Sequence, residues 1–460
     1  MLFGQYRRIV SLAANGGLPA IGAAREFVDV GGLMSYGVNL PDLARLRCRM
    51  EEKSNMSDRY SLQPFHEFRE SLSAETYDDV RARANVKAES GEAFEEMRSH
   101  LLKLYGGVEV AHSFLESGSK IVDCIPIEQQ PSIRHSGQTV LPPPPQPPGV
   151  KTYPDPLDPT VPFRKAPPPQ LHPDRYDSLG NQMWCPVGTI PMIRLTLAEL
   201  ANSKTLKDAL RSASGGDPKR WAAAYQQIDH LGGSSYINVW GPQVFGVQNS
   251  ASQQWFSTPL APFVTYQSVE CGWRVGTPSP PFDANPRLFI YFTPDDHVTN
   301  IYNLMGPGFV QQSGTAVLGA ELTGVSQPGG DQFDYNMGFF LTGNAWWFSF
   351  NGQWIGYYPT SLFQGGGLAT SAGSAGFGGE TSGIGAFPAM GSGAFPQAGF
   401  QQAAYQRNIF VTPVGGAAQP ANLSPGQQYP SCYNTVVSNN SPTTWGTFMY
   451  FGGPGGIGCP

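Results

Sequence analysis

The hydrophobic pattern divides the chain into a short helical part and a much longer strand-rich part. Between residues 57 and 120, apolar side chains recur at the spacing of one helix face, as in the series Phe94, Met97, Leu101, Leu102 and Tyr105. This spacing predicts helices there. A short strand is predicted next, over residues 121–127.

From about residue 179, short apolar runs alternate with turn residues. Strands are predicted at 236–240, 287–293, 346–350 and 353–358, and helical patches near 196–226. Asn351-Gly352 separates the last two strands and predicts a two-residue hairpin turn, because both positions of such a turn need positive φ angles. Many short strands with little helix predict a mainly β protein, an antiparallel β-sandwich preceded by a small helical segment.

A proline-rich stretch separates the two parts. Residues 141–170 contain 13 prolines in 30 positions. Proline fixes φ and lacks an N–H group, so this stretch cannot build a packed core and is expected to form an extended, polyproline-like linker. A passive spacer is the simplest interpretation, and a stretch that is cut during maturation is the alternative.

Charge is distributed unevenly and excludes several classes of partner. Residues 57–123 hold 13 acidic and 8 basic residues, whereas residues 251–460 hold 8 acidic residues, 3 arginines and no lysine. The net charge of −6 argues against a nucleic-acid binder. No apolar run reaches the roughly 18 residues of a membrane span, and the spacing of histidines and cysteines matches no metal site. No cofactor, metal, nucleic acid or membrane partner is therefore expected.

Few glutamates remain in the charge-poor half, so each one needs a reason. Glu270 lies in a predicted strand, 268–275, where it shares a face with Gly272 and Arg274. The missing side chain of Gly272 would leave space beside the carboxylate. Periodicity alone favours a simpler interpretation, a solvent-exposed Glu270 paired with Arg274.

Glu380 lies in a run of glycines, residues 376–383, where the backbone can turn sharply or approach a ligand closely. A carboxylate in a flexible loop is the simpler interpretation. If Glu270 and Glu380 met, their titrations would split, and one could take a proton from water while the other donated one. Sequence alone does not show that they meet.

Several segments, in order along the chain, resemble the neprosin family of glutamic peptidases. They cover about residue 120 to the end and comprise Val122-Asp123-Cys124-Ile125 with Gln130-Pro131, Cys185 to Pro191, Ser268 to Val275, Gly378-Gly379-Glu380, Met390 to Pro396, Arg407-Asn408-Ile409 and Tyr450 to Pro460. The resemblance implies a β-sandwich with two catalytic glutamates, Glu270 and Glu380, that hydrolyses peptide bonds on the carboxyl side of proline in acid. Which glutamate is the base stays open.

The resemblance also implies a division of the chain and its maturation. Residues 56–140 would be a helical activation segment, 141–178 the linker and 179–460 the peptidase domain. Such a protein would be made as a zymogen, secreted, monomeric and free of cofactors, and its partners would be proline-containing peptides or proteins. Two disulfides are implied, Cys124 with Cys185 and Cys432 with Cys459, whereas Cys271 is expected to be a small buried apolar residue.

The first 55 residues form an extension of doubtful role. Residues 1–47 resemble the C-terminal fragment of a substrate-binding protein of ABC transporters, which is too short to fold as that domain. Arg7 and Arg8 before a mildly apolar stretch give only a poor imitation of a signal peptide.

Two other function classes fit the same features. Two carboxylates on an aromatic-rich β-sandwich also describe many glycoside hydrolases. Alternatively, a non-catalytic adhesion or carbohydrate-binding protein would use Trp346, Trp347 and Trp354 as a binding platform, although packing of these rings in the hairpin core is the simpler expectation.

Overall fold

The computed structural model of the 460-residue chain describes residues 21–22, 34–35, 62–84, 86–116, 120–137, 139–145, 164–165, 167–210, 218–259, 261–276, 282–364, 366–426 and 429–459. The chain splits into two compact units, Met1–Ser61 and Leu62–Pro460. In the first, only the paired strands β1 (Ile21–Gly22) and β2 (Met34–Ser35) are described. The rest of the transporter-like segment, and half of the linker (residues 146–163 and 166), therefore lie outside the described residues.

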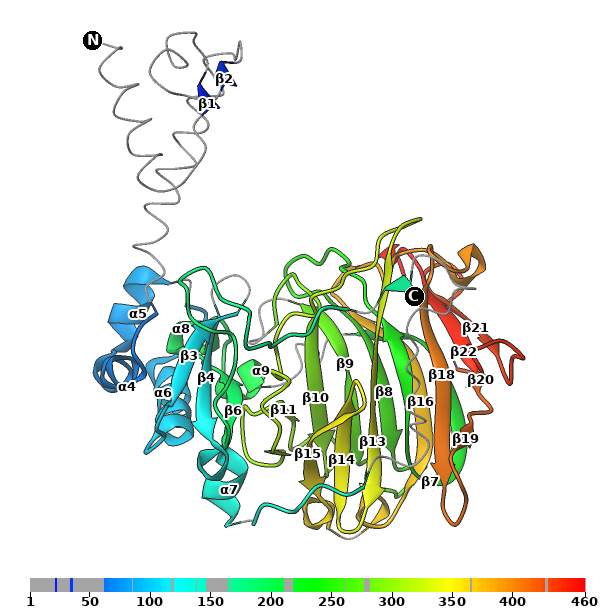
Figure 1. The fold of residues 1–460 in the computed structure, drawn as a ribbon, viewed down its shortest axis with the longest axis horizontal. Coiled ribbons are helices and arrows are strands. Elements are labelled where there is room, and N and C mark those ends of the chain that lie inside the picture. Colours follow the sequence, from blue (N-terminus) through cyan, green and yellow to red (C-terminus); the bar gives the residue numbers. More distant parts are fainter. Residues whose placement is uncertain are drawn as a thin grey trace. The chain divides into compact units, whose positions relative to one another are not determined.

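Helices open the second unit, as the periodicity predicts. They are α4 (Phe65–Ala74), α5 (Tyr77–Arg83) and α6 (Gly91–Tyr105). The side chain of Ser90 caps α6 by accepting a hydrogen bond from the backbone N–H of Ala93 at 3.2 Å. The predicted apolar face of α6 is buried, with Leu102 at its half-buried margin. Figure 1 shows α6 beside α4 and α5.

A small antiparallel sheet connects residues before the linker with residues after it. Its strand order is β3 (His112–Leu115), β4 (Ile121–Pro126) and β6 (Thr189–Ile193). The helix α7 (Pro131–Ser136) follows β4, and the short helices α8 (Leu197–Leu200) and α9 (Leu206–Leu210) follow β6. The helical prediction for 196–226 is thus right as far as Leu210, but the chain is a strand from Lys219, because that segment joins the large sheet.

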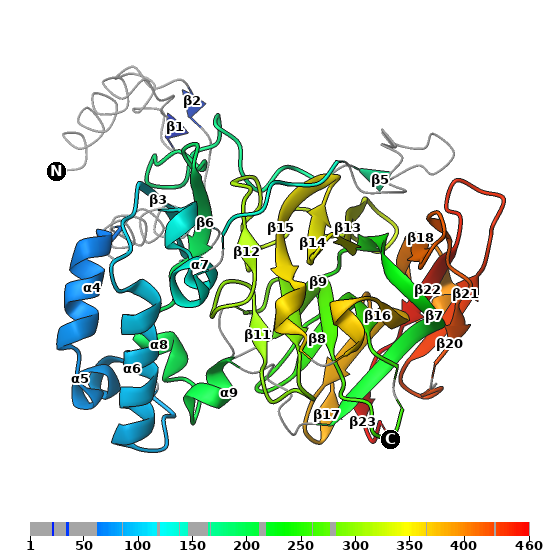
Figure 2. The same cartoon turned by 90° about the horizontal axis from the view of Figure 1, so that it is seen from below.

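The large sheet folds over on itself into two layers that share the 20-residue strand β7 (Lys219–Asn238) (Figures 1 and 2). The first half of β7 pairs with β16 (Ala372–Ser382), and the second half pairs with β13 (Gln332–Thr342) and β18 (Ala404–Pro413). The change occurs at Gly232, where φ is +110° and a Cβ atom would lie 2.0 Å from the carbonyl oxygen of Phe339. Only glycine fits this bend.

The first layer has the order β11-β10-β9-β8-β16-β7, and the second has the order β12-β15-β14-β13-β7-β18-β22-β21. Apart from the parallel pair β5–β13, the strand pairs in these layers are antiparallel. The remaining bounds are β8 (Asn249–Ser257), β9 (Ser268–Gly276), β10 (Arg287–Thr293), β14 (Ala345–Phe350), β15 (Gln353–Pro359), β22 (Phe448–Gly452), β5 (Arg164–Lys165), β11 (Ile301–Tyr302), β12 (Val310–Gln311), β17 (Ala386–Phe387), β19 (Gln419–Pro420), β20 (Ser424–Pro425), β21 (Asn434–Ser438), β23 (Gly456–Ile457), and the 3-10 helices Ile127–Gln129, Thr360–Leu362, Gly367–Ala369 and Pro396–Ala398.

Aromatic rings fill the space between the layers. Phe292 of the first layer contacts Tyr358 of the second at a ring distance of 4.7 Å, and the indole N–H of Trp273 donates to the carbonyl oxygen of Asn238 at 2.9 Å. The hairpin at Asn351-Gly352 has the predicted positive φ angles, 48° and 76°. The predicted mainly β sandwich with few helices is confirmed.

Candidate active site

Strand register brings Glu270 and Glu380 to one face of the first layer. Glu270 on β9 lies opposite Trp255 of β8, and Glu380 on β16 lies opposite Ala251 of the same strand. Trp255 and Ala251 are four residues apart, and residues at even separations on a strand point to the same side. Both glutamates therefore project from the same surface, two strands apart and separated by β8.

Glycines clear the space between the two glutamates. Gln253, midway between Ala251 and Trp255, lies opposite Gly272 on one side and Gly378 on the other. A Cβ at Gly272 would lie 2.1 Å from the carbonyl oxygen of Ser252, and one at Gly378 would lie 2.3 Å from that of Ala222. Between the two carboxylates, the three paired positions are therefore Gly272, Gln253 and Gly378, and only Gln253 has a side chain. The space predicted beside Glu270 is present.

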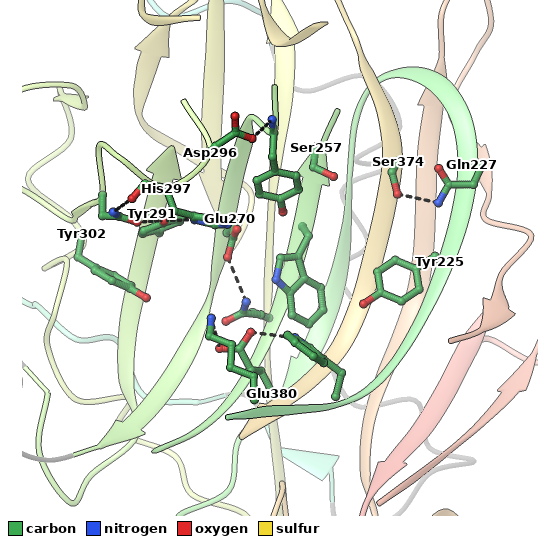
Figure 3. A pocket seen from close by; sticks show the side chains of 16 residues that line it. Tyr225, Gln227, Ser257, Glu270, Tyr291, Asp296, His297, Tyr302, Ser374 and Glu380 are labelled. Carbon is green, nitrogen blue, oxygen red and sulfur yellow. Dashed lines mark hydrogen bonds and ion pairs between the residues drawn. The ribbon is translucent and has the colours of Figure 1, made fainter. Parts of the chain in front are cut away.

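The cleared face forms a cavity of about 760 Å³ that both carboxylates line (Figure 3). Its lining is mostly aromatic and polar: Lys219, Trp221, Tyr225, Gln227, Gln253, Trp255, Ser257, Tyr266, Glu270, Tyr291, Asp296, His297, Asn300, Tyr302, Ser374 and Glu380. A cavity of this size accommodates several residues of a peptide or a few sugar units.

Glu270 is buried, with an exposed fraction of 7%. Its Oε1 accepts a hydrogen bond from Ser268 Oγ at 2.7 Å, and its Oε2 accepts one from Gln253 Nε2 at 3.1 Å. Burial, and to a lesser degree the nearby charge of Glu380, raise the pKa of Glu270 to about 8, against the opposing effect of the Ser268 hydrogen bond. The prediction of a solvent-exposed Glu270 is wrong, because both faces of β9 are covered.

Arg274, the neighbour of Glu270 on the same face, is buried as well. Its guanidinium donates to Asn249 Oδ1 at 3.0 Å and to the hydroxyl of Tyr302 at 3.3 Å. The surface ion pair expected from periodicity is therefore replaced by hydrogen bonds deeper in the same layer.

Glu380 lies within strand β16, so the prediction of a flexible loop is wrong. The glycines around it serve close packing between strands. Its Oε1 forms an ion pair with Lys219 Nζ at 3.0 Å, and its Oε2 accepts a hydrogen bond from Trp221 Nε1 at 2.9 Å. The Glu380 side chain is 16% exposed. Burial by itself lowers the pKa of Lys219, but the Glu380 carboxylate outweighs that effect and the pKa is raised, so the lysine carries its charge throughout the acidic range.

Sequence reasoning missed three residues that set the environment of the pair: Lys219, Trp221 and Gln253. One feature of the sequence could have pointed to Lys219: it is the last lysine in the chain and stands at the start of the charge-poor half. No feature of the sequence pointed to Trp221 or Gln253, because their positions beside the glutamates depend on strand register.

A second polar group lies on the opposite rim of the cavity. The Tyr291 hydroxyl is hydrogen-bonded to His297 Nδ1 at 2.8 Å and to Asn300 Oδ1 at 2.5 Å (Figure 3). Burial lowers the pKa of His297, which disfavours its charged form. These residues form a hydrogen-bonding wall opposite Lys219 and Glu380.

The predictions for the cysteines are confirmed, and the one for the tryptophans is not. The disulfides Cys124–Cys185 and Cys432–Cys459 are present, and Cys271 is free and buried, as expected. The platform of three tryptophans is wrong: Trp346 and Trp347 are adjacent on β14 and point to opposite faces, and the buried Trp346 indole donates to the carbonyl oxygen of Leu368 at 2.7 Å.

The described residues provide neither a cluster of metal ligands nor a helix able to span a membrane. They contain no group of three or more His, Cys, Asp or Glu side chains arranged to hold a metal ion. Among the helices of that same part of the chain, none has the length and apolar character needed to cross a membrane.

Comparison with known families supports the resemblance seen in the sequence. Residues 246–454 match the Neprosin family, which confirms the resemblance over that region. The region includes both glutamates and most of the large sheet. This match supports the general assignment of the chain as a peptidase.

Solved structures give weaker likenesses. Scytalido-glutamic peptidase with a transition state analog inhibitor aligns at 10% identity and a TM-score of 0.28, over 52% of this chain and 99% of that one. SCP-B, an eqolisin-family peptidase bound to the tripeptide Ala-Ile-His, gives 10% identity and 0.27 over the same shares. The kappa-carrageenase of Pseudoalteromonas carrageenovora gives 8% and 0.20, over 51% and 67%. Scores this low bear on neither the fold nor the activity of this chain.

Proposed function

We propose that this chain is an acid-acting endopeptidase of the glutamic type, with Glu380 as the general base and Glu270 as the acid. One observation carries the proposal: two carboxylates line the same cavity in opposite environments. Glu380 forms an ion pair with the ammonium group of Lys219 and accepts a hydrogen bond from the Trp221 indole N–H. Glu270 is buried, and its raised pKa favours the protonated form.

The proposed reaction uses water as the nucleophile. The Glu380 carboxylate takes a proton from a water molecule, whose oxygen attacks the carbonyl carbon of the scissile bond. The Glu270 carboxyl donates a hydrogen bond to the carbonyl oxygen, where negative charge develops. When the tetrahedral intermediate collapses, the carbon–nitrogen bond breaks and the proton held by Glu380 passes to the leaving nitrogen. No acyl-enzyme forms, because neither carboxylate bonds to the substrate.

We further propose that the enzyme cuts on the carboxyl side of proline. The neprosin resemblance implies this specificity. The aromatic lining of the cavity is compatible with it, since Tyr225, Trp255, Tyr266 and Tyr291 offer flat apolar faces to a compact pyrrolidine ring. Proline-containing peptides or proteins would be the substrates, and a single chain would suffice for activity.

We also propose that the protein is made as a secreted zymogen. Two disulfides favour an oxidising compartment. Buried ion pairs hold the segment before the linker to residues after it: Asp123 pairs at 2.6 Å with Arg194, which follows β6, and Glu116 pairs at 3.0 Å with Arg287 of β10 in the large sheet. Breaking both ion pairs would loosen the segment. Cleavage within residues 141–170 would then complete maturation.

A matched peptide series tests the activity and its specificity. Acid-treated protein would be incubated at about pH 3–6 with peptides that differ only in having proline or alanine at one position, and the products identified by mass. The proposal expects cleavage after proline and little after alanine. Intact peptides throughout the series, together with sugar release from polysaccharides, would contradict it and favour a glycoside hydrolase instead.

A further inference from the structure

The outer face of the β14–β15 hairpin carries a group of aromatic rings that the proposed reaction does not use. Trp347, Trp354 and Tyr357, called here the outer aromatic surface, point away from the layer interface. Trp347 lies 4.7 Å from Tyr357 and 5.9 Å from Trp354, measured between ring centres. These rings belong to a cluster separate from the main core, and none of them lines the cavity that contains Glu270 and Glu380.

The start of the proline-rich linker covers this surface. Residues 139–145, which follow α7, run past β15 and β14 (Figure 2). The Tyr357 hydroxyl accepts a hydrogen bond from the backbone N–H of Leu141 at 3.0 Å and donates one to the carbonyl oxygen of Thr139 at 3.0 Å. The Trp354 indole N–H donates to the carbonyl oxygen of Pro144 at 3.1 Å. Gln312 on the adjoining segment donates to the carbonyl oxygen of Leu141.

These contacts have the chemistry of polyproline recognition. A proline run has a fixed extended backbone, and its carbonyl oxygens have no internal hydrogen-bond donors. Aromatic side chains with N–H or O–H groups supply donors to those carbonyls and flat surfaces for the pyrrolidine rings. The contacts to the carbonyl oxygens of Thr139, Leu141 and Pro144 use backbone acceptors that other proline-rich sequences also present, whereas the bond from the Leu141 N–H requires a residue other than proline at that one position.

We propose that the outer aromatic surface is a binding site for proline-rich segments, occupied in cis by residues 139–145 and available to a second proline-rich chain once that segment is displaced. Such a site would hold a proline-rich substrate on the enzyme while the separate cavity cuts it. The role in substrate capture rests on the proposed peptidase function, but the binding itself does not.

The test measures binding of a proline-rich peptide to a full-length chain whose own linker has been altered so that it competes poorly for the outer aromatic surface. Pro142, Pro143, Pro144 and Pro145 would all be changed to serine, in a Glu270→Gln background that prevents cleavage. The probe is a labelled synthetic peptide with the sequence of residues 139–145, and its binding is followed by fluorescence anisotropy. A tethered segment competes at an effective concentration in the millimolar range, so the four-serine chain is expected to bind the peptide at least about tenfold more tightly than its parent.

Three controls decide the outcome. Adding Trp354→Ala to the four-serine chain is expected to weaken binding about tenfold, and Trp354→Phe, which keeps a ring but loses the N–H donor, to weaken it less. Tyr176→Ala, at an exposed ring outside the surface, should leave binding unchanged. The proposal is overturned if the four-serine chain binds no better than its parent, if Trp354→Ala has no effect, or if a peptide with serine for proline binds equally well. Because the protein is catalytically blocked, these results do not depend on whether it is a peptidase.

Discussion

Glu270 and Glu380 are the same residue type on one sheet face, yet their neighbours give them different properties. Glu380 has a cation at 3.0 Å and an indole donor at 2.9 Å, whereas Glu270 has only uncharged donors, from Ser268 and Gln253. A carboxylate without a cation is costly to bury, so the proton stays on Glu270. This difference supports the separate roles proposed for the two residues.

The raised pKa of Glu270 predicts a pH-dependent effect on stability. A carboxyl whose folded-state pKa lies above its ordinary value of 4.5 stabilises the fold fully below that value, and this contribution is lost as the pH rises through about 8. Glu270→Gln, which cannot ionise, should therefore raise the free energy of unfolding by a few kcal/mol at about pH 9 relative to the wild type. Near pH 4 the two proteins should unfold alike.

Urea denaturation at both pH values measures this difference. A matched control is Glu95→Gln, at a solvent-exposed carboxylate on α6, which should show no comparable gain in stability at pH 9. Equal unfolding of wild type and Glu270→Gln at pH 9 would mean that Glu270 ionises as an ordinary carboxyl.

The sequence could name the two glutamates only through the family resemblance. Periodicity correctly put Glu270 on the face of Gly272, but it could not tell that this face lines a cavity rather than meeting solvent. That distinction depends on β8, β10 and β16, whose positions beside β9 are set by long-range pairing. The ion pair between Lys219 and Glu380 joins residues 161 positions apart (380 − 219), a separation that no local pattern reveals.

At the scale of elements, Gly272 of β9 and Gly378 of β16 allow the neighbouring strands to pair, because a Cβ atom at either position would collide with their backbone. Gly272→Ala would put a Cβ atom 2.1 Å from the carbonyl oxygen of Ser252 and 2.7 Å from Gln253 Cα, so the strands β8 and β9 would have to separate locally. We expect the substitution to lower the free energy of unfolding by about 1–3 kcal/mol and to reduce activity, because Gln253 and Glu270 would shift together.

Chemical denaturation with a parallel activity assay checks this prediction. Gly91→Ala at the start of α6, where an added Cβ meets nothing within 4 Å, serves as the control and should unfold at the same or slightly higher denaturant concentration. A fully stable and fully active Gly272→Ala protein would show that the space above this strand is not needed.

Some elements are encoded locally and others are not. The Asn351-Gly352 turn and the apolar face of α6 were predictable because each depends on nearby residues. Strand β16 was not, since its glycine-rich sequence has low intrinsic strand propensity. It is a strand because β7 and β8 pair with it on both sides. The helix predicted as far as residue 226 is wrong over its last residues, because from Lys219 onward they pair with β16 as part of β7.

At the scale of the whole molecule, the segment before the linker is part of the folded unit. Strand β4 pairs with β6 across the linker, and Cys124–Cys185 joins the two sides covalently. Gln130 and Gln311 exchange hydrogen bonds through side chain and backbone, at 2.9 and 2.7 Å. Cutting the linker would therefore leave the two pieces connected by the disulfide.

This arrangement predicts what electrophoresis would show after acid processing. Cleavage within residues 141–170 should give two fragments on a reducing gel but a single species without reductant. The variant with both Cys124→Ser and Cys185→Ser should give two fragments under either condition. Separation of the wild-type fragments without reductant would place the cut outside the loop that this disulfide closes.

The pH profile of kcat/KM on a proline-containing peptide tests the different roles of the two glutamates most directly. The wild type should be active in acid and should have lost its activity by about pH 8, where Glu270 loses its proton. Glu380→Gln should fall by at least about a thousandfold at every pH. Glu270→Gln, whose amide still donates a hydrogen bond but does not titrate, should fall by about ten- to a hundredfold and lose the decline at high pH. An active Glu380→Gln protein, or a Glu270→Gln protein with the same decline as the wild type, would contradict the assignment.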